Sequence, residues 1–287
     1  MSAQVLGLQF INGLTLAALL FLLASGFTLI FGLMRIMNLS HGALYLVGGY
    51  LGLTVIRATG NFFLAALVAA LGVMLLGLFT ERFLMRPIRV LAMPEVLLSI
   101  GLAFVLGDVS LAIWGGDPQT LKTPDFLSGS LSILGTTYPM FRFVVLAVGA
   151  AICAALWYLQ ERTRIGAIVR AGVDDREMVD AVGINVKAVF TAVFAFGALL
   201  AGLAGVMGGA FLAIYPGADF EILTYALVVV VIGGPGSLLG AVIGSVAVGM
   251  IDAYSTQLIP EFKYFTIFAP MALTLWWRPY GLFGRAW

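Results

Sequence analysis

Charge is what this sequence lacks most: only 10% of its 287 residues are Asp, Glu, Lys or Arg, whereas 62% are hydrophobic. A soluble domain carries roughly 25% charged residues, so the composition excludes an ordinary soluble protein. Several uncharged stretches are long enough for a membrane-spanning helix, which needs about 20 apolar residues. They are residues 1–34, 58–80, 188–218 and 222–251. We therefore predict an all-α fold, a polytopic helical bundle integral to the membrane.

Histidine and cysteine are almost absent too, with one of each at His41 and Cys153. A zinc site would have to rely mainly on carboxylates. A catalytic triad would have to use His41, and no G-x-S-x-G motif is present. The chain also lacks a G-x-x-x-x-G-K-[ST] phosphate loop, so any ATP must be bound by another chain. We expect no catalytic residue, metal site or cofactor, and the net charge of +1 does not indicate nucleic acid.

Nine segments are candidates for membrane spans: 8–33, 39–57, 62–80, 95–114, 139–159, 187–213, 220–233, 237–257 and 262–277. The segment 220–233 is short. It is either re-entrant or one half of a broken helix, so we expect eight or nine spans in a single transmembrane domain that covers residues 1–287.

The basic residues predict which way the chain is inserted, because Lys and Arg are enriched in cytoplasmic loops. With nine spans, ten of them fall on one side: Arg82, Arg86, Arg89, Arg162, Arg164, Arg170, Arg176, Lys187, Arg278 and Arg285. Four fall on the other: Arg57, Lys122, Arg142 and Lys263. The N-terminus is then outside and the C-terminus cytoplasmic. Residues 115–138 form an external loop, in which SLSILGTTYP can make a short hairpin.

Glycine is abundant, with 35 residues, and part of it recurs at four-residue spacing. Small residues at this spacing let membrane helices approach closely. The sets are Gly236–Gly240–Gly244, Ala201–Gly205–Gly209 and Gly48–Gly52. We expect them to serve mainly in helix packing.

The most charged segment is a loop at about 160–187, ERTRIGAIVRAGVDDREMVDAVGINVKAV. Apolar residues recur in it at helical spacing, which predicts two short amphipathic helices. Asp174 and Asp175 can begin the second helix, with Glu177 in its first turn. The polar face mixes both signs, so docking to a protein is favoured over a helix lying on lipid, which would carry a polar face rich in Lys and Arg.

The segment 34–52, MRIMNLSHGALYLVGGYLG, interrupts the apolar sequence with polar residues and glycine. A helix broken there exposes backbone groups that lipid cannot satisfy, so the break must lie inside the protein or beside water. Asn38 and Ser40 are good N-cap residues, which is one explanation. The other is that the N-terminus of the next helix lies beside a translocation route, with His41 as a neutral hydrogen-bond partner. GPGSLLGAVIG, at 234–244, begins with a similar glycine-centred break.

Ionisable residues inside a membrane are candidates for function, and here they are Arg35, Asp108 and Asp252. A purely structural explanation for the two acids is that each lies at the membrane surface or bonds to a neighbouring helix. The alternative is a proton- or ion-coupled secondary transporter that acts without ATPase partners and uses one of them.

Four segments together resemble a known family. NLSHGALYLVGGYLG, RAGVDDREMVDAVGINV, GGPGSLLGAVIG and WWRPYGLFG occur in the order found in permease subunits of branched-chain amino acid ABC importers, the LivH type. The resemblance covers nearly the whole chain. It implies half of a translocation pathway for branched-chain amino acids or related small polar solutes in a bacterial plasma (inner) membrane.

The resemblance also implies partners and roles. The partners are a second homologous permease, identical or different, two cytoplasmic ATPases, and a periplasmic or extracellular substrate-binding protein. The pathway candidates are Asn38, Ser40, His41, Gly42, Gly234 and Gly236. The candidates for coupling to an ATPase are Arg170, Asp174, Asp175, Arg176, Glu177 and Gly183.

Overall fold

A computed structural model describes residues 3–35, 37–88, 92–133 and 136–284. The helices of its first half are α1 (Ala3–Met34), α2 (His41–Thr59), α3 (Phe62–Phe79), η1 (Thr80–Met85), η2 (Arg86–Ile88), α4 (Ala92–Trp114) and η3 (Asp125–Leu127). A hairpin of β1 (Ser130–Ile133) and β2 (Thr136–Pro139) follows. The second half contains α5 (Phe141–Arg162), α6 (Arg164–Asp174), α7 (Arg176–Ala181), α8 (Val186–Phe211), α9 (Ala218–Gly233), α10 (Leu238–Leu258), η4 (Pro260–Phe262) and α11 (Lys263–Trp277). The predicted fold class is confirmed.

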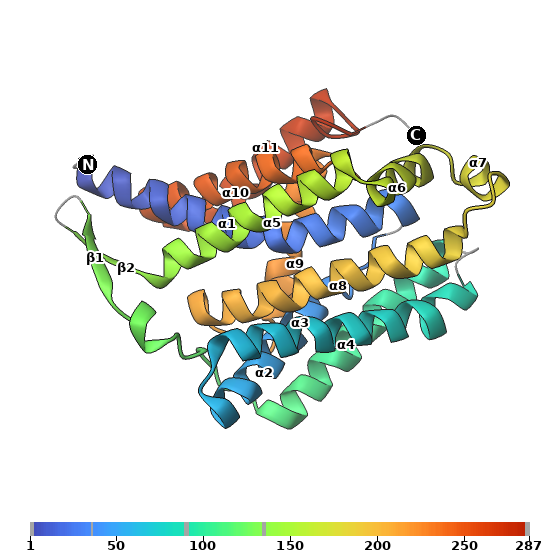
Figure 1. Ribbon diagram of the computed structural model, residues 1–287. Helices are drawn as coiled ribbons and strands as arrows, with labels where there is room; N and C mark the ends of the chain where they lie inside the picture. Colours follow the sequence, from blue (N-terminus) through green and yellow to red (C-terminus); the bar gives the residue numbers. More distant parts are fainter. Residues whose placement is uncertain (1–2, 36, 89–91, 134–135, 285–287) are drawn as a thin grey trace.

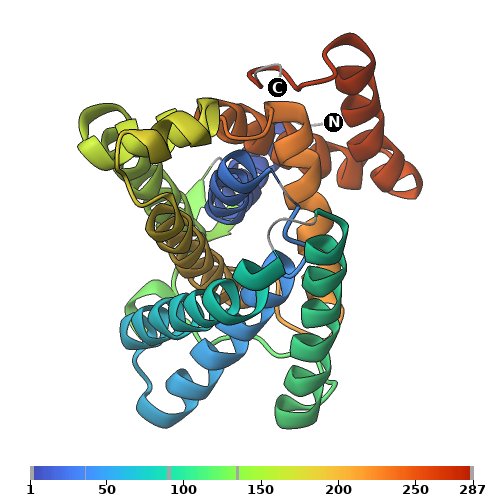
Figure 2. The ribbon, with the colours of Figure 1, turned by 90° about the vertical axis from the view of Figure 1, so that its right-hand side faces the viewer.

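Helix α1 is the centre of the bundle. Figure 2 shows it in blue, surrounded by the other helices, and it contacts α5, α8, α9 and α10. A helix that is apolar on every side must be buried. The sequence of α1 has this character, and Leu19, Leu20, Leu22 and Leu23 are fully buried. The other spans are therefore positioned relative to α1.

Seven helices of the described residues are long and apolar enough to cross a membrane: those at 4–34, 41–59, 62–88, 93–114, 141–162, 186–211 and 238–258. Two predicted spans are shorter. Helix α9 has 16 residues and α11 has 15. The segment 220–233 is thus short, as predicted, and the nine candidate spans all appear as helices.

The two ends of the bundle carry different elements. In Figure 1 the N-terminus and the β-hairpin lie at one end, whereas α6, α7 and the C-terminus lie at the other. The hairpin is antiparallel, with Ser130 opposite Pro139, as the sequence predicted. Because the N-terminal end and the residues of the loop at 160–187 are at opposite ends, the arrangement fits the predicted alternation of spans.

The repeated glycines bring helices into backbone contact. A Cβ atom added at Gly48 of α2 would lie 2.5 Å from Cα of Gly202 in α8. One added at Gly240 of α10 would lie 2.2 Å from the carbonyl oxygen of Gly233 in α9. Atoms cannot approach so closely, so only glycine fits at these crossings, as expected for small-residue packing.

Asp252, one of the acids expected inside the membrane, links three helices. The Tyr225 hydroxyl of α9 donates a hydrogen bond to its carboxylate at 2.7 Å. Nζ of Lys263, at the start of α11, lies 3.1 Å from the same oxygen. Asp252 belongs to α10, so this contact connects α9, α10 and α11. These bonds to neighbouring helices give Asp252 a structural role inside the bundle.

Candidate functional site

The predicted break between the first two spans is present, and it begins with a strained residue. Helix α1 ends at Met34, and Arg35 takes a left-handed backbone conformation with φ of 57°. Its N–H still donates to the carbonyl of Phe31 at 2.8 Å, and its guanidinium donates to the carbonyl of Val173 in α6 at 3.3 Å. The end of α1 is thereby joined to the loop helix α6. Ile36 lies outside the described residues.

Asn38 and Ser40 organise the turn in a different way from the predicted cap. Ser40 is the residue before α2, but its hydroxyl does not cap the helix. Instead, its hydroxyl and its N–H both donate to Oδ1 of Asn38, at 2.6 and 3.2 Å. The backbone of Ser40 is already helical, with φ of −74° and ψ of −4°, so its side chain is not directed at the next turn. The expectation that Ser40 caps through its side chain was wrong, because Asn38 closes the turn one step earlier.

His41 is fully buried between α1 and α2. Its Nε2–H donates to the carbonyl of Leu23 at 3.1 Å, and its ring lies 5.5 Å from the ring of Phe27. Within the described residues, Nδ1 has no hydrogen-bond partner. The imidazole therefore holds the start of α2 against the middle of α1.

Gly42, the next residue, packs against α9 instead of α1. A Cβ atom there would lie 2.2 Å from the carbonyl oxygen of Asp219 and 2.8 Å from Cβ of Leu223, both in α9. His41 and Gly42 thus fix the first turn of α2 against two helices, α1 and α9. The break has its shape because two adjacent residues contact two different elements.

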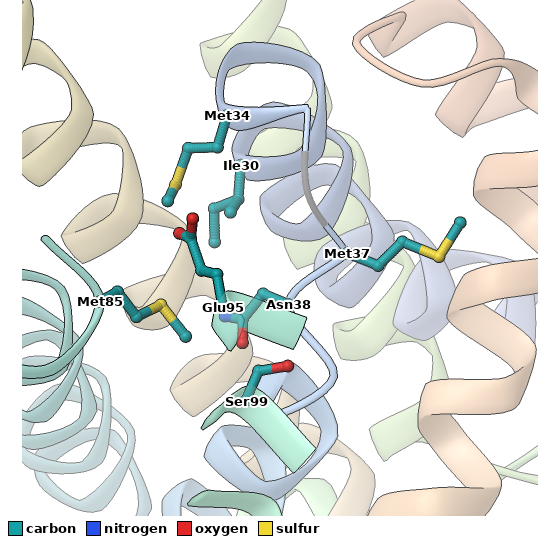
Figure 3. Close-up of a pocket in the computed structure, with 7 residues that line it drawn as sticks. All are labelled: Ile30, Met34, Met37, Asn38, Met85, Glu95 and Ser99. Carbon is teal, nitrogen blue, oxygen red and sulfur yellow. The ribbon is translucent and has the colours of Figure 1, made fainter. Parts of the chain in front are cut away.

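Asn38 also lines a small pocket, which Figure 3 shows in close-up. The carboxylate of Glu95 reaches up between Asn38 and Met34, Ser99 lies below it, and Met85 points in from the opposite wall. Ser99, in α4, accepts a hydrogen bond from the N–H of Leu39 at 3.1 Å. Nδ2 of Asn38 is buried and lacks a hydrogen-bond partner within the described residues. The turn is thus anchored to α4 and presents a polar group to this pocket.

The second predicted break separates α9 from α10. Gly234 and Gly236 have φ of 97° and 77°, which are conformations that favour glycine. Ser237 then caps α10, because its hydroxyl accepts from the N–H of Gly240 at 3.0 Å. The N–H of Gly236 donates to the hydroxyl of Thr28 in α1, also at 3.0 Å. Both breaks are therefore joined to α1.

The C-terminal motif RPYGLFG packs on the second break. The N–H groups of Leu282 and Phe283 donate to the carbonyls of Ile232 and Gly233, at 2.9 and 3.0 Å. The last turn of a helix leaves four carbonyls without intrahelical partners, and this motif satisfies two of those in α9. Sequence analysis found the motif but not this role. Arg89 and Arg285, which entered the prediction of orientation, lie outside the described residues.

The charged loop contains the two predicted helices, each with a side-chain cap. Thr163 caps α6 by accepting from the N–H of Gly166 at 3.2 Å, and Asp175 caps α7 by accepting from that of Met178 at 3.0 Å. Arg176 is the first residue of α7, and Glu177 lies exposed in its first turn. Gly183 follows with φ of 87° and turns the chain toward α8.

Only part of the apolar surface of these helices is covered. Val169 and Val179 are buried, and Val179 packs with Leu33 of α1 and Phe190 of α8. On the outside, three side chains remain more than half exposed: Ile165 at 62%, Met178 at 60% and Val182 at 72%. The loop is therefore fixed to α1 and α8 and leaves a mixed surface of apolar and charged residues at this end.

A cleft of about 870 Å³ joins the two groups of predicted residues. Gly236 from the second break lines it, together with Arg170 and Asp174 from α6 and Arg35 from the first break. Asn38, Ser40, His41 and Gly42 lie elsewhere, inside the bundle. The predicted residues thus form two neighbouring regions, both attached to α1.

Sequence reasoning missed several acids. Asp219 in the first turn of α9, Glu81 in η1 and Glu95 in α4 are all buried. Next to Asp219, Glu221 accepts a hydrogen bond from Tyr215 at 2.6 Å, which raises the pKa of that phenol to about 12. Acids in a first turn complement the helix dipole, so GADFE before an apolar run was the available signal for Asp219. MPEVLLSIG gave the same signal for Glu95, which lies in the first turn of α4, whereas no comparable pattern marked Glu81.

Comparison with known proteins gives consistent relatives. Residues 9–275 match the family described as branched-chain amino acid transport system / permease component. The chain is 31% identical to the high-affinity branched-chain amino acid transport system permease protein LivH of Escherichia coli K12, with 96% of this chain and 95% of the relative covered. It is 28% identical to the corresponding protein BraD of Pseudomonas aeruginosa, with the same coverage.

Among solved structures, the chain is similar to a chain of PsaBC from Streptococcus pneumoniae in complex with Fab. The TM-score is 0.52 at 16% identity, and the match covers 96% of this chain and 95% of the other. At this identity the likeness shows the fold alone.

Proposed function

This chain belongs to the family of permease components of branched-chain amino acid transport systems, and from that premise we propose that it is the transmembrane permease subunit of an ATP-driven importer. Its solute is a branched-chain amino acid or a related small polar molecule. The subunit contributes half of the translocation pathway, and separate subunits bind and hydrolyse ATP. Family membership favours this function over a secondary transporter.

We propose that the two breaks lie beside the solute route. Both interrupt helices near α1, and non-helical backbone at membrane depth is tolerated where it lines a cavity or is covered by protein. Asn38 supports this role most directly, because its buried Nδ2 has no partner within the described residues and faces Glu95 across a pocket that is too narrow to hold water in this conformation. Ser40, His41, Gly42, Gly234 and Gly236 hold the backbone at the breaks.

We further propose that α6 and α7 couple the permease to an ATPase. The observation that carries this is the exposed apolar surface of Ile165, Met178 and Val182, which lies among charged residues at the end of the bundle opposite the N-terminus. That end would be cytoplasmic. Arg170 and Asp174 lie in α6, with Asp174 as its last residue and not in the second helix; Asp175 joins the two helices, Arg176 and Glu177 begin α7, and Gly183 follows it. The full complex would also contain a second permease subunit, two ATPases and a substrate-binding protein outside.

The capping role of Asp175 decides how coupling should be tested. Asp175→Arg would remove the cap of α7, which costs about 0.5–2 kcal/mol, and would confuse folding with docking. Asp175→Asn keeps a capping oxygen and removes the charge, whereas Glu177→Arg reverses a charge outside the cap. Single exposed pairs contribute only about 0.2–1 kcal/mol, so the two changes should be combined.

The experiment measures co-purification with the ATPase subunits and ATP-driven uptake in proteoliposomes. The double variant should lose both while keeping the folded yield of the permease. Glu261→Arg, an exposed charge reversal in η4 just before α11, is the matched control and should retain both. Uptake by the chain alone under a proton gradient would overturn the proposal and favour the secondary transporter.

A further inference from the structure

The cleft beside α6 has long apolar walls. Ala150, Cys153, Ala154 and Trp157 line it from α5, and their spacing puts them on one face of that helix. Leu238, Leu239 and Val242 line it from α10, and Leu29 and Val169 also contribute. The α5 wall from Ala150 to Glu161 is about 16 Å long at 1.5 Å per residue. The volume of about 870 Å³ lies within the range of roughly 300–1,000 Å³ that is usual for ligand sites.

Charged side chains gather at one end of this cleft. Two are cationic, Arg35 and Arg170, and two are anionic, Glu161 and Asp174. Nη1 of Arg170 lies 3.7 Å from Oε1 of Glu161, which is too long for a hydrogen bond. This buried nitrogen makes no hydrogen bond within the described residues. The rim therefore offers both signs of charge, with a net charge of zero, next to apolar walls.

The cleft also faces the surroundings of the bundle. Trp157 and Leu239, on its two walls, are each more than half exposed. In a membrane protein such side chains meet lipid, and tryptophan is enriched at the boundary between the acyl chains and the headgroups. Pockets between spans with basic residues at the membrane surface bind lipid headgroups. The apolar walls of the cleft thus correspond to the acyl chains of a phospholipid, its tryptophan to the boundary region, and its charged rim to the headgroup.

We propose that this cleft binds one membrane phospholipid whose headgroup is zwitterionic, of the phosphatidylethanolamine class. The phosphate lies against the guanidinium groups of Arg170 and Arg35, and the ammonium lies against the carboxylates of Glu161 and Asp174. Part of an acyl chain lies between α5 and α10. A free amino acid is also a zwitterion, but it would fill only a small part of a wall about 16 Å long.

Cys153 offers a direct test, because it is the chain's only cysteine and it lines the cleft. The full chain is delipidated in detergent, and the rate at which Cys153 reacts with a small maleimide is measured. Phosphatidylethanolamine should slow the reaction severalfold. Phosphatidylglycerol should slow it less, and inorganic phosphate and leucine should have no effect. Equal protection by phosphatidylglycerol would overturn the zwitterionic headgroup. The lipid site would be overturned if leucine protected Cys153 or if neither lipid did.

Matched variants test the same site by native mass spectrometry of retained lipid. Ala154→Trp fills the trough and should abolish retention, whereas Ala155→Trp, on the exposed neighbouring face, should not. Arg170→Gln should lower retention severalfold relative to Arg164→Gln, whose side chain does not line the cleft. Glu161→Gln should shift selectivity toward phosphatidylglycerol. Equal retention by both alanine variants would overturn the proposal, and none of these measurements depends on ATP or on transport.

Discussion

The N–H of Gly236 donates a hydrogen bond to the Thr28 hydroxyl at 3.0 Å, so the second helix break is attached directly to the central helix. Gly32, one turn further along α1, lies against the same glycine: a Cβ added there would be 2.4 Å from Cα of Gly236. A polar contact and a close backbone contact therefore hold this break together.

Thr28→Val should destabilise the break. Valine keeps the shape of threonine but removes the acceptor, and a partly buried donor left unsatisfied costs about 1–3 kcal/mol. Hydrogen exchange should become faster at residues 234–237, and the unfolding temperature should fall. Thr224→Val is the control, because that hydroxyl is exposed and donates to a carbonyl of its own helix. If both variants behave alike, the Thr28 contact has no special role.

Gly42→Leu should prevent the bundle from forming its native packing. The new Cβ would meet the backbone oxygen of Asp219 at 2.2 Å, and a backbone cannot move aside as a side chain can. Overpacking usually costs about 1–3 kcal/mol, and we expect the upper part of that range. Folded yield in detergent gives the measurement. Gly101→Leu, in α4, is the control because no atom of the described residues lies within 4 Å of its Cβ position. Comparable yields for the two variants would contradict the packing argument.

His41→Gln should retain most transport, since an amide can donate to the Leu23 carbonyl in place of the imidazole. His41→Leu removes this hydrogen bond, which contributes about 0.5–1.5 kcal/mol. Stability and transport should therefore fall together in the leucine variant, at matched expression. Loss of transport with unchanged stability would instead mean that the imidazole acts on the solute.

Lys263→Met should weaken the attachment of α11. It leaves Asp252, whose side chain is 13% exposed, with the Tyr225 hydroxyl but without its cation. Adding Asp252→Asn should restore part of the lost unfolding temperature, because the amide that replaces the carboxylate carries no charge and needs no cation. Lys122→Met provides the control, since the Lys122–Asp125 pair is largely exposed and should matter little. An additive double variant would show that the pair is not coupled.

Cysteine labelling checks the orientation. In a Cys153→Ala background, Thr120→Cys should react with an impermeant thiol reagent in intact cells, and Glu177→Cys, which leaves the Asp175 cap of α7 in place, should be protected. Both positions are exposed, so a difference reports the side of the membrane. Labelling of position 177 from outside would reverse the predicted insertion.

Much of the fold could be predicted from the sequence because lipid restricts the possible structures. Apolar runs must be helices when they span a bilayer, so the spans, the short segment at 220–233 and the break after Met34 followed directly. The hairpin and the two loop helices had local signals of their own.

The sequence could not show which elements the breaks contact. Ser40 looked like a cap, yet its hydroxyl bonds to Asn38, because the backbone of Ser40 had already become helical. The contacts of Gly42 with α9 and of Gly236 with α1 join residues far apart in the chain. The buried Glu81 is similar: its partner Thr191 is 110 residues away, and no local pattern indicates such a pair.

The contact between α9 and the RPYGLFG motif sets an order of events during synthesis. Leu282 bonds to Ile232, so the end of α9 depends on a residue made 50 positions later. Until then, two of its carbonyls face an environment with few donors. The last turn of α9 therefore gains these two partners only after residues 282 and 283 have been synthesised, so we expect the end of this helix to become ordered later than the turns before it.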